Sequence, residues 1–356
     1  MTVINFGNKT ISNEGAPYII AEIGVNHEGS MDRAKKLISL AKDGGADAVK
    51  FQTYKAESLA SKNSPAYWDT KKEPTQNQYK LFKKYDSFGP NEFSELSKYS
   101  IKNGIDFLST PFDNNAVDFL NPLVSCFKIA SADITNIPLL RKIAKKNKPI
   151  FLSTGASSID EIDSAIQELV KNGCKKKEIV VMHCILNYPT EKKNANLNMI
   201  KSLKQKYSDH LIGYSDHTLP DKNMSSLISA FLLGATVIEK HFTDNKALVG
   251  NDHYHSMDVN DLINLKKLLK EFQILLGLFT EKKPIDSEKI ARENARRSIV
   301  LKHDVKAGHR LVAEDITCKR PGTGVSPLHC DKILGYTVIN NLNADHILQW
   351  KDLKKN

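Results

Sequence analysis

Two lysines lie inside otherwise apolar runs of this 356-residue chain, Lys50 in "AVKFQ" and Lys128 in "CFKIA". An apolar interior cannot solvate an unpaired ammonium, so each lysine needs a carboxylate partner or an anionic ligand. Short hydroxyl donors end or follow similar runs, and these donors are Thr110, Ser131, Ser153 and Ser215. Two cations with several short donors suit a small, densely charged anion such as a phosphorylated carboxylic acid. The sequence therefore predicts an anion site.

The two lysines also allow a purely structural interpretation. Glu22 ends the run "YIIAE" and Glu239 lies in "TVIEKH", so either glutamate could pair with Lys50 or Lys128 in a buried ion-pair network. We favour the anion site and keep the ion-pair network as its alternative.

Two histidines add a candidate metal site. His217 in "GYSDHT" and His241 in "EKHFT" each stand at the end of an apolar run, 24 positions apart. Either histidine alone fits a packed residue that is hydrogen-bonded to a carbonyl. As a pair at neighbouring strand ends, two neutral imidazoles can hold a divalent ion and leave positions open for water and substrate. His183 ends a third run and would join them if its side chain points inward.

Ser215, Asp216 and His217 are consecutive, and the three residue types are those of a hydrolase triad. The chain has no G-x-S-x-G nucleophile elbow, and triad residues come from separate elements of a fold. We therefore exclude the triad. Neighbours in a strand point to opposite faces, so Asp216 should point away from Ser215 and His217 as a supporting or structural partner.

Eight short apolar runs carry these residues at or near their ends, and they alternate with segments of helical period. The runs are 18–22, 48–52, 106–110, 126–130, 149–154, 179–184, 211–215 and 236–241. Eight strands alternating with helices over about 250 residues predict an α/β fold, the (β/α)8 TIM barrel, with its chemistry at the carboxyl ends of the strands. An open doubly wound sheet is the alternative, but no G-x-G-x-x-G follows any run.

Helical spacing is clearest in three segments. The positions Ala34, Leu37, Ile38 and Ala41 follow i, i+3, i+4, i+7, and so do Met224, Leu227, Ile228 and Phe231. Ser158 and Glu161 form a capping box ahead of the apolar stripe Ile159, Ile162, Ile166 and Leu169. These stripes predict helices between the strands.

The pattern changes along the chain suggest two domains. Residues 1–279 hold the barrel with an N-terminal β-hairpin, 280–291 form a charged linker, and 292–356 form a small β-rich module. A polar insertion with interleaved aromatic residues spans 54–90. Loops of this length are uncommon unless functional, so the insertion could be a lid on the catalytic face. An oligomer contact, or a loop packed by its own aromatic residues, is the alternative.

Composition narrows the functional classes. The formal net charge is +10 and the pI about 9.1, but the lysines are dispersed and no recognition motif accompanies them, so we expect no nucleic acid partner. Five cysteines without CxxC or CxxH spacing argue against a disulfide framework or a cysteine-built zinc site. No apolar window approaches the ~18 residues that span a bilayer, and no secretory signal opens the chain, so we expect a cytoplasmic protein without a membrane partner.

A series of motifs along this chain resembles, in the same order, those of the sialic acid synthase family. They are "AEIGVNHEGS", "GGADAVKFQT", "FLSTPFD", "FKIASADITNIPLL", "LSTG", "GYSDHT" and "EKHFT", and the ending "ITCKRPGTGVSP" is similar to that family's SAF, or antifreeze-like, domain. The resemblance implies a TIM barrel followed by a SAF domain, in a domain-swapped homodimer. It also implies an enzyme that condenses phosphoenolpyruvate with an open-chain N-acetyl hexosamine and water, giving N-acetylneuraminate (sialic acid) and phosphate.

The same resemblance implies roles for individual residues. Phosphoenolpyruvate would be held by Lys50, Thr110, Lys128, Ser131, Ser153 and Ser215. His217 and His241 would bind Mn²⁺ or Mg²⁺, and Glu22 would stabilise charge or handle a proton at the reacting centre. The sugar would be contacted by Gln52, Asp133, Tyr188 and Asp252, and by Arg320 from the other subunit.

Three sugar-side positions depart from the family pattern. Leu186 stands where some members have a polar residue, Asp133 where some have glutamate, and Asn251 where proline is common before Asp252. N-acetylmannosamine is the expected sugar, and a legionaminic, pseudaminic or 6-phosphorylated-hexosamine synthase is the alternative. A non-catalytic ice-binding or carbohydrate-binding protein is the alternative of another class, and the combination of lysines and histidines counts against it.

Overall fold

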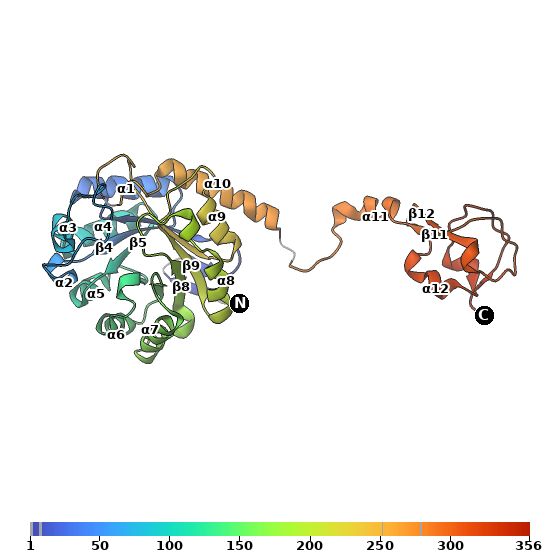
Figure 1. The fold of residues 1–356 in the computed structure, drawn as a ribbon, viewed down its shortest axis with the longest axis horizontal. Helices are drawn as coiled ribbons and strands as arrows, with labels where there is room; N and C mark the ends of the chain where they lie inside the picture. Colours follow the sequence, from blue (N-terminus) through green and yellow to red (C-terminus); the bar gives the residue numbers. More distant parts are fainter. Residues whose placement is uncertain (1–2, 7–8, 251, 278–279) are drawn as a thin grey trace. The chain divides into compact units, whose positions relative to one another are not determined.

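The computed structural model describes residues 3–6, 9–250, 252–277 and 280–356 (Figure 1). The chain divides into two compact units at Gly277. The first unit holds all of the long parallel strands, and the second holds short strands and turns.

Eight parallel strands form the first unit's sheet, each overlapping one of the predicted runs. They are β3 (Tyr18–Gly24), β4 (Ala48–Thr53), β5 (Asp106–Pro111), β6 (Phe127–Ile129), β7 (Ile150–Ser153), β8 (Ile179–Cys184), β9 (Leu211–Asp216) and β10 (Val237–His241). The ladder runs in the order β5-β4-β3-β10-β9-β8-β7-β6, and its end strands β5 and β6 lie side by side. The sheet is therefore a nearly closed barrel, which confirms the predicted fold.

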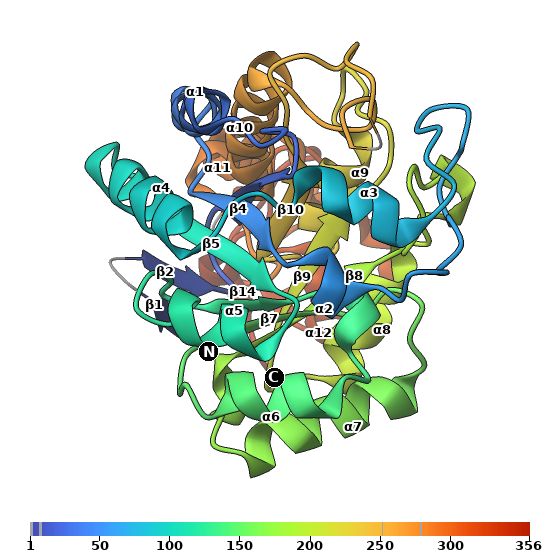
Figure 2. The ribbon, with the colours of Figure 1, turned by 90° about the vertical axis from the view of Figure 1, so that its left-hand side faces the viewer.

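Helices surround this sheet (Figure 2). In chain order they are α1 (Met31–Asp43), α2 (Ala56–Leu59), α3 (Gln78–Tyr85), α4 (Pro90–Lys102), α5 (Asn114–Leu120), α6 (Ile137–Ala144), α7 (Ile159–Lys171), α8 (Asn198–Lys206), α9 (Ser225–Leu232) and α10 (Val259–Leu276). Among these described helices, none is long and apolar enough to cross a bilayer.

The three predicted helices form, with two differences in detail. The α1 stripe is buried as expected, and the Ser158–Glu161 capping box starts α7. Ile159 belongs to the apolar stripe of α7 but is 40% exposed, because residues 158–161 at the start of the helix are all exposed, whereas Ile162, Ile166 and Leu169 are buried. Met224 precedes α9 in a left-handed conformation with φ 46°, so the helix begins one residue later than its stripe.

The barrel interior is apolar at the amino-terminal end of the strands. Its inward side chains include Ile20, Ala48, Leu108, Phe151, Met182, Leu211 and Val237. The antiparallel strands β1 (Val3–Phe6) and β2 (Lys9–Ser12) add Ile4, Phe6 and Ile11 to this cluster. The rings of Phe6 and Phe151 lie 5.7 Å apart, edge to face. Apolar side chains thus fill this end, which leaves the carboxyl end for polar residues.

The second unit has a small core of its own, made of residues such as Ile299, Leu301, Leu348 and Leu353. Strand β11 (Ser298–Leu301) pairs with β12 (Ile316–Lys319), and β13 (Thr337–Val338) pairs with β14 (Leu353–Lys354), both antiparallel. Helix α12 (Cys330–Ile333) precedes β13. The segment 280–291, predicted as a linker, carries a 3-10 turn (Asp286–Glu288) and the start of α11 (Lys289–Ala295).

Candidate active site

A cavity of about 500 Å³ opens at the carboxyl ends of the barrel strands. The predicted site residues that line it are Glu22, Lys50, Gln52, Thr110, Lys128, Ser131, Asp133, Ser153, Tyr188, Ser215, His217, His241 and Asp252. Arg320 is exposed in the second unit and is not among the residues lining the cavity. Asn251, the position that departs from the family pattern, lies outside the described residues.

Strand alternation explains why these residues meet. Ile20 and Glu22 share one face of β3, and Ala48 and Lys50 share one face of β4, because side chains alternate with period two. In β3, β4, β5, β7 and β10 the interior layer of apolar residues is therefore continued, two residues further along the strand, by a polar layer. Register pairs Glu22 with Lys50 across β3 and β4.

The polar layer is a cluster of two lysines and two glutamates. Lys50 Nζ lies 2.7 Å from Glu22 Oε2 and 3.8 Å from Glu239 Oε1, and it donates a hydrogen bond to Thr110 Oγ1 at 3.1 Å. Lys128 Nζ lies 3.8 Å from the same Glu239 oxygen. The alternative network predicted with Glu22 and Glu239 thus forms, and Glu239 joins the site.

The two lysines differ in how well they are compensated. Desolvation acts to lower the pKa of Lys50, but the carboxylates of Glu22 and Glu239 outweigh it and raise that pKa. Desolvation lowers the pKa of Lys128, and Glu239 offsets this only in part. Desolvation also raises the pKa of Glu22. The attraction of Lys50 acts to lower this pKa but does not cancel the effect of desolvation. Lys128 is therefore the cation with the stronger need for an added anion.

Three serine hydroxyl groups that line the cavity with Lys128 differ in their hydrogen bonding. Ser215 donates to Glu239 Oε1 at 3.0 Å, and Ser131 Oγ accepts from the backbone N–H of Gly155 at 2.9 Å. Ser153 Oγ is buried and has no hydrogen-bond partner among the described residues. A buried hydroxyl without a partner costs free energy, so a ligand that accepts its proton would be stabilised there.

The predicted histidine pair does converge on the cavity. The ring centroids of His217 and His241 are 5.6 Å apart. Nδ1 of His217 donates to Ile185 O at 2.8 Å, which leaves Nε2 as the ring atom for a ligand. Cys184 Sγ lies 3.9 Å from the same Nδ1; the mutual attraction outweighs desolvation, lowering the pKa of the thiol and raising that of His217.

His183 does not join them. It lies on the outward face of β8, where its ring stacks on Tyr214 at 5.6 Å and its Nε2 hydrogen-bonds Ala195 O at 2.8 Å. Met182 and Cys184, its neighbours in the strand, are the inward residues. The condition for a third participant is therefore not met, because strand alternation turns His183 away from the cavity.

A different group lies beside His241. Potential ligand atoms of His241, Asp252 and His255 all lie within 4.8 Å of one another. Burial, with His255 and His217 nearby, holds the pKa of His241 well below its usual value, so the ring is neutral at pH 7. Nδ1 of His241 is buried without a hydrogen bond in the part of the chain that the structure describes. Imidazole and carboxylate donors fit a divalent ion.

Asp216 and Lys240 occupy the opposite face of the same two strands. Asp216 accepts from the Tyr214 hydroxyl at 2.7 Å, from the Thr218 backbone N–H at 2.9 Å and from Lys240 Nζ at 2.6 Å. The predicted outward direction of Asp216 is confirmed. Because these bonds hold both neighbours of His217, they fix the strand end that presents it.

Two of the sugar-side residues, Gln52 and Asp252, lie beside Gly24. Gln52 Nε2 donates to Glu22 Oε1 at 3.1 Å, and Asn136 holds Asp133 at 3.0 Å. Gly24 has φ 56°, and a Cβ there would lie 3.3 Å from both Gln52 Nε2 and Glu22 Oε1. Glycine therefore allows this backbone conformation and this close approach.

The 54–90 insertion forms a wall of the cavity. Its lining residues are Tyr54, Leu59, Tyr67, Gln78, Leu81, Phe82 and Tyr85, and Leu186 adds an apolar group. Trp68 is buried, and its Nε1 donates to Glu73 O and Thr75 O. The insertion is therefore both packed by its own aromatic residues and part of the site. Its individual wall residues were not predicted.

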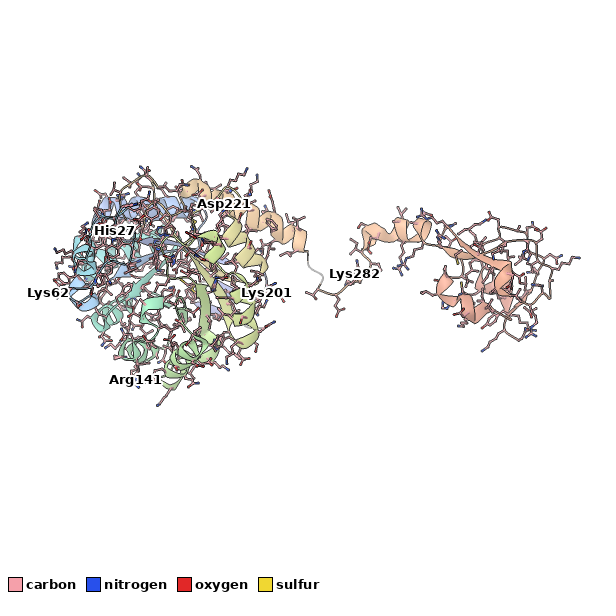
Figure 3. The ribbon with its side chains drawn as sticks, in the orientation of Figure 1. His27, Lys62, Arg141, Lys201, Asp221 and Lys282 are labelled. Atoms are coloured by element: carbon pink, nitrogen blue, oxygen red, sulfur yellow. The ribbon has the colours of Figure 1, made fainter. Side chains whose placement is uncertain are left out.

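Positive charge outside the cavity is dispersed. Lys62, Arg141 and Lys201 lie on separate sides of the barrel unit (Figure 3). Arg141 pairs with Glu168 at 2.5 Å. The cationic side chains aimed into the cavity are instead Lys50 and Lys128.

Comparison with known proteins places these residues in a family. Residues 37–281 match the NeuB family and residues 296–354 match the SAF domain. The N,N'-diacetyllegionaminic acid synthase of Campylobacter jejuni is 39% identical, over 93% of this chain and 98% of that protein. The N-acetylneuraminate-9-phosphate synthase of Homo sapiens is 32% identical, over 92% of this chain and 90% of that protein.

A solved structure agrees with this placement. The N-acetylneuraminic acid synthetase of Leptospira borgpetersenii, in complex with citrate, has a TM-score of 0.70 and 34% identity, covering 81% of this chain and 94% of that one. The NeuB match spans well over half of the chain. The chain therefore belongs to the NeuB family, as a phosphoenolpyruvate-dependent synthase with a C-terminal SAF domain.

Proposed function

We propose that this protein joins phosphoenolpyruvate to an open-chain, non-phosphorylated N-acyl hexosamine. C3 of the enolpyruvate forms a carbon–carbon bond with the sugar aldehyde carbon, water adds at C2, and phosphate leaves as its C–O bond breaks. The supporting observation is the grouping of Lys50, Lys128 and two histidines in one cavity.

Phosphoenolpyruvate would occupy the lysine end of the cavity. Its carboxylate and phosphate would take over Lys128 and the Ser215 hydroxyl from Glu239, which now contacts both. Ser153 would gain the acceptor that it lacks among the described residues. Thr110 and Ser131 add short donors at the same end. Lys50 would keep its tight pair with Glu22 and contribute charge without being left unpaired.

Glu22 would act at the reacting carbon. It connects the two halves of the site, since Oε2 contacts Lys50 and Oε1 accepts from Gln52. Burial raises its pKa, which suits a group that handles a proton near neutral pH. As a carboxylate it would also stabilise positive charge that develops at C2.

His217 and His241 would hold the divalent ion. When bound, the ion would supply Lewis acidity that polarises the sugar aldehyde. A donor set containing imidazole nitrogens suits Mn²⁺ better than Mg²⁺, which takes oxygen ligands and keeps its waters.

The cavity favours an uncharged sugar. No arginine, and no lysine beyond Lys50 and Lys128, lines it among the described residues of one chain. The one further cation proposed for the sugar side is Arg320 of the other subunit, which contacts the sugar, so a sugar phosphate would have no second cation to pair with. N-acetylmannosamine, the sugar expected from the sequence, meets this condition. A sugar with two acetamido groups is the second candidate, because the aromatic wall offers apolar surface and a 39% identical relative is a diacetyllegionaminic acid synthase.

We further propose a cytoplasmic homodimer in which Arg320 reaches the partner's cavity. The end of α10 supports a subunit contact, since Ile274, Leu275 and Leu276 are 71%, 79% and 58% exposed. Exposed apolar groups in sequence are typical of surfaces that are covered in an assembly.

A substrate panel tests the proposed function. Phosphate release from phosphoenolpyruvate is measured with N-acetylmannosamine, its 6-phosphate and a 2,4-diacetamido hexose, each with Mn²⁺ or after chelation. We expect turnover with a free sugar, no turnover with the 6-phosphate, and loss of turnover after chelation. Preferred use of the phosphorylated sugar would contradict the charge argument, and full activity after chelation would contradict the metal role.

A further inference from the structure

The loop after β10 brings a carboxylate, from Asp252, and a second imidazole, from His255, close to His241. Asp252 Oδ2 lies 3.6 Å from His241 Nδ1. The ring of His255, which is fully buried, lies 4.8 Å from that of His241, closer than the 5.6 Å between His241 and His217. Two imidazoles and one carboxylate thus meet at one corner of the site.

The 3.6 Å between His241 Nδ1 and Asp252 Oδ2 is the spacing of two ligands around one ion. A distance of 3.6 Å is too long for a hydrogen bond between nitrogen and oxygen. Ligand atoms that share an ion at about 2.1 Å each lie roughly 3–4 Å apart. The described structure also gives His241 Nδ1 no hydrogen bond, although the atom is buried. An ion between His241 and Asp252 would account for both observations.

The backbone holds this loop firmly against β10. The Met257 backbone N–H donates to His241 O at 2.8 Å, and the Thr243 backbone N–H donates to Met257 O at 3.0 Å. The Asn26 side-chain amide donates to both Phe242 O and Ser256 Oγ. These bonds flank the loop at both ends, so His241 and the residues 252–255 keep a fixed relation. A metal site gains affinity from such preorganisation.

We propose that Asp252 and His255 are ligands of the divalent ion, completing with His241 a site of two imidazoles and one carboxylate, with His217 as a further ligand. Such a set leaves positions open for water and substrate. The proposal rests on the proposed function in taking the cavity to bind a divalent ion. It extends the expected role of Asp252 from sugar contact to ion ligand, and it gives a role to His255, which sequence reasoning missed.

The test counts nitrogen ligands directly. The full-length protein is stripped with a chelator and titrated with Mn²⁺, and bound ion is measured by calorimetry and by pulsed electron paramagnetic resonance, which detects coordinated imidazole nitrogens. We expect His255→Asn and Asp252→Asn to weaken Mn²⁺ binding by about tenfold or more. We expect only His255→Asn to remove one nitrogen coupling.

A matched control separates ligation from packing. His210 is also buried, and its Nδ1 donates to Ile179 O at the amino-terminal end of β8, away from the cavity. His210→Asn should leave the Mn²⁺ affinity and nitrogen coupling of wild type. Thermal unfolding of each stripped variant checks folding, and His255→Gln serves if His255→Asn is unstable.

The outcomes distinguish this proposal from the proposed function. If wild type binds Mn²⁺ and His241→Asn abolishes binding, while the His255 and Asp252 variants bind as wild type, this proposal is overturned and the proposed function stands. If wild type binds no Mn²⁺, both fail. An unchanged nitrogen coupling in folded His255→Asn also overturns the assignment of His255.

Discussion

Asp216 and Lys240 pair at 2.6 Å on the outward face of β9 and β10, where their side chains are 0% and 1% exposed. The register makes them direct neighbours and, one position earlier, sets Ser215 beside Glu239 on the inward face. Lys240 also donates to Thr218 O at 2.6 Å. A buried ion pair behind the barrel wall therefore fixes the two strand ends that carry His217 and His241.

Breaking this pair should lower both the stability of the fold and the Mn²⁺ affinity of the site, although neither residue lines the cavity. Lys240→Met leaves Asp216 charged and buried without its cation, so we expect the free energy of unfolding to fall by about 3–5 kcal/mol. Urea unfolding measures this free energy. The Mn²⁺ affinity should also fall, because the strand end that carries His217 loses its support. The double variant Asp216→Asn, Lys240→Met should regain part of the stability. Equal losses in the single and double variants would refute a coupled pair.

Lys128 should affect ligand binding more than folding. Lys128→Met removes a buried ammonium with no carboxylate nearer than 3.8 Å among the described residues, so the ligand-free protein should be as stable as wild type or more stable. Phosphoenolpyruvate should no longer raise its melting temperature, and kcat/KM should fall about 10²–10³-fold. Differential scanning fluorimetry with and without phosphoenolpyruvate checks this. Lys201→Met, on the exposed face of α8, is the control and should behave as wild type.

Glu22 should impose a specific pH dependence on stability. Its pKa is raised in the folded state, so between its unfolded and folded pKa values the folded chain binds more protons than the unfolded chain. This contribution stabilises at low pH and is lost as pH rises through the folded pKa. Relative to wild type, Glu22→Gln should therefore gain stability with rising pH above about 4.5. Urea unfolding across this pH range measures the free energy of unfolding of both proteins. If the two free energies changed with pH in parallel, the prediction would be contradicted.

Arg320 provides a test of the domain-swapped dimer. We expect Lys128→Met to inactivate the barrel of one subunit and Arg320→Ala to inactivate the small domain of the other. Refolded together, swapped heterodimers would contain one intact site, with the barrel of the Arg320→Ala chain and the small domain of the Lys128→Met chain. We expect activity to be recovered on mixing, measured as phosphate release. No recovery, despite heterodimers confirmed by mass spectrometry, would indicate that Arg320 does not act across subunits.

The barrel and its polar layer could be predicted because both follow from local pattern. Lys50 and Lys128 are exceptional in apolar strands, and strand ends are where barrels place their chemistry. Strand alternation would also have excluded His183, since it is one residue out of step with Met182 and Cys184. The same rule could have placed Glu239 inward, between the outward Ile238 and Lys240.

Other parts of the site depend on loop geometry, which has no period. His255 reaches His241 only because the segment after β10 folds back along the strand. The wall formed by Tyr67, Phe82 and Tyr85 depends on how the insertion packs. Ile159 matched a helical stripe but stands in an exposed first turn. Periodicity indicates which face of a helix is buried. Which turns of that face other elements cover depends on the tertiary structure.

The hairpin strands β1 and β2 have a kinetic consequence. Their side chains Ile4, Phe6 and Ile11 fill the amino-terminal end of the barrel, so the described cavity is entered from its carboxyl end alone. Both substrates and both products then share one entrance. Lys50 lies two residues beyond Ala48 of the apolar layer, and Gln52, a proposed sugar contact, lies two residues further toward the carboxyl end of β4. A sugar bound first would obstruct its partner, so steady-state kinetics should be sequential and ordered, with phosphoenolpyruvate as the leading substrate.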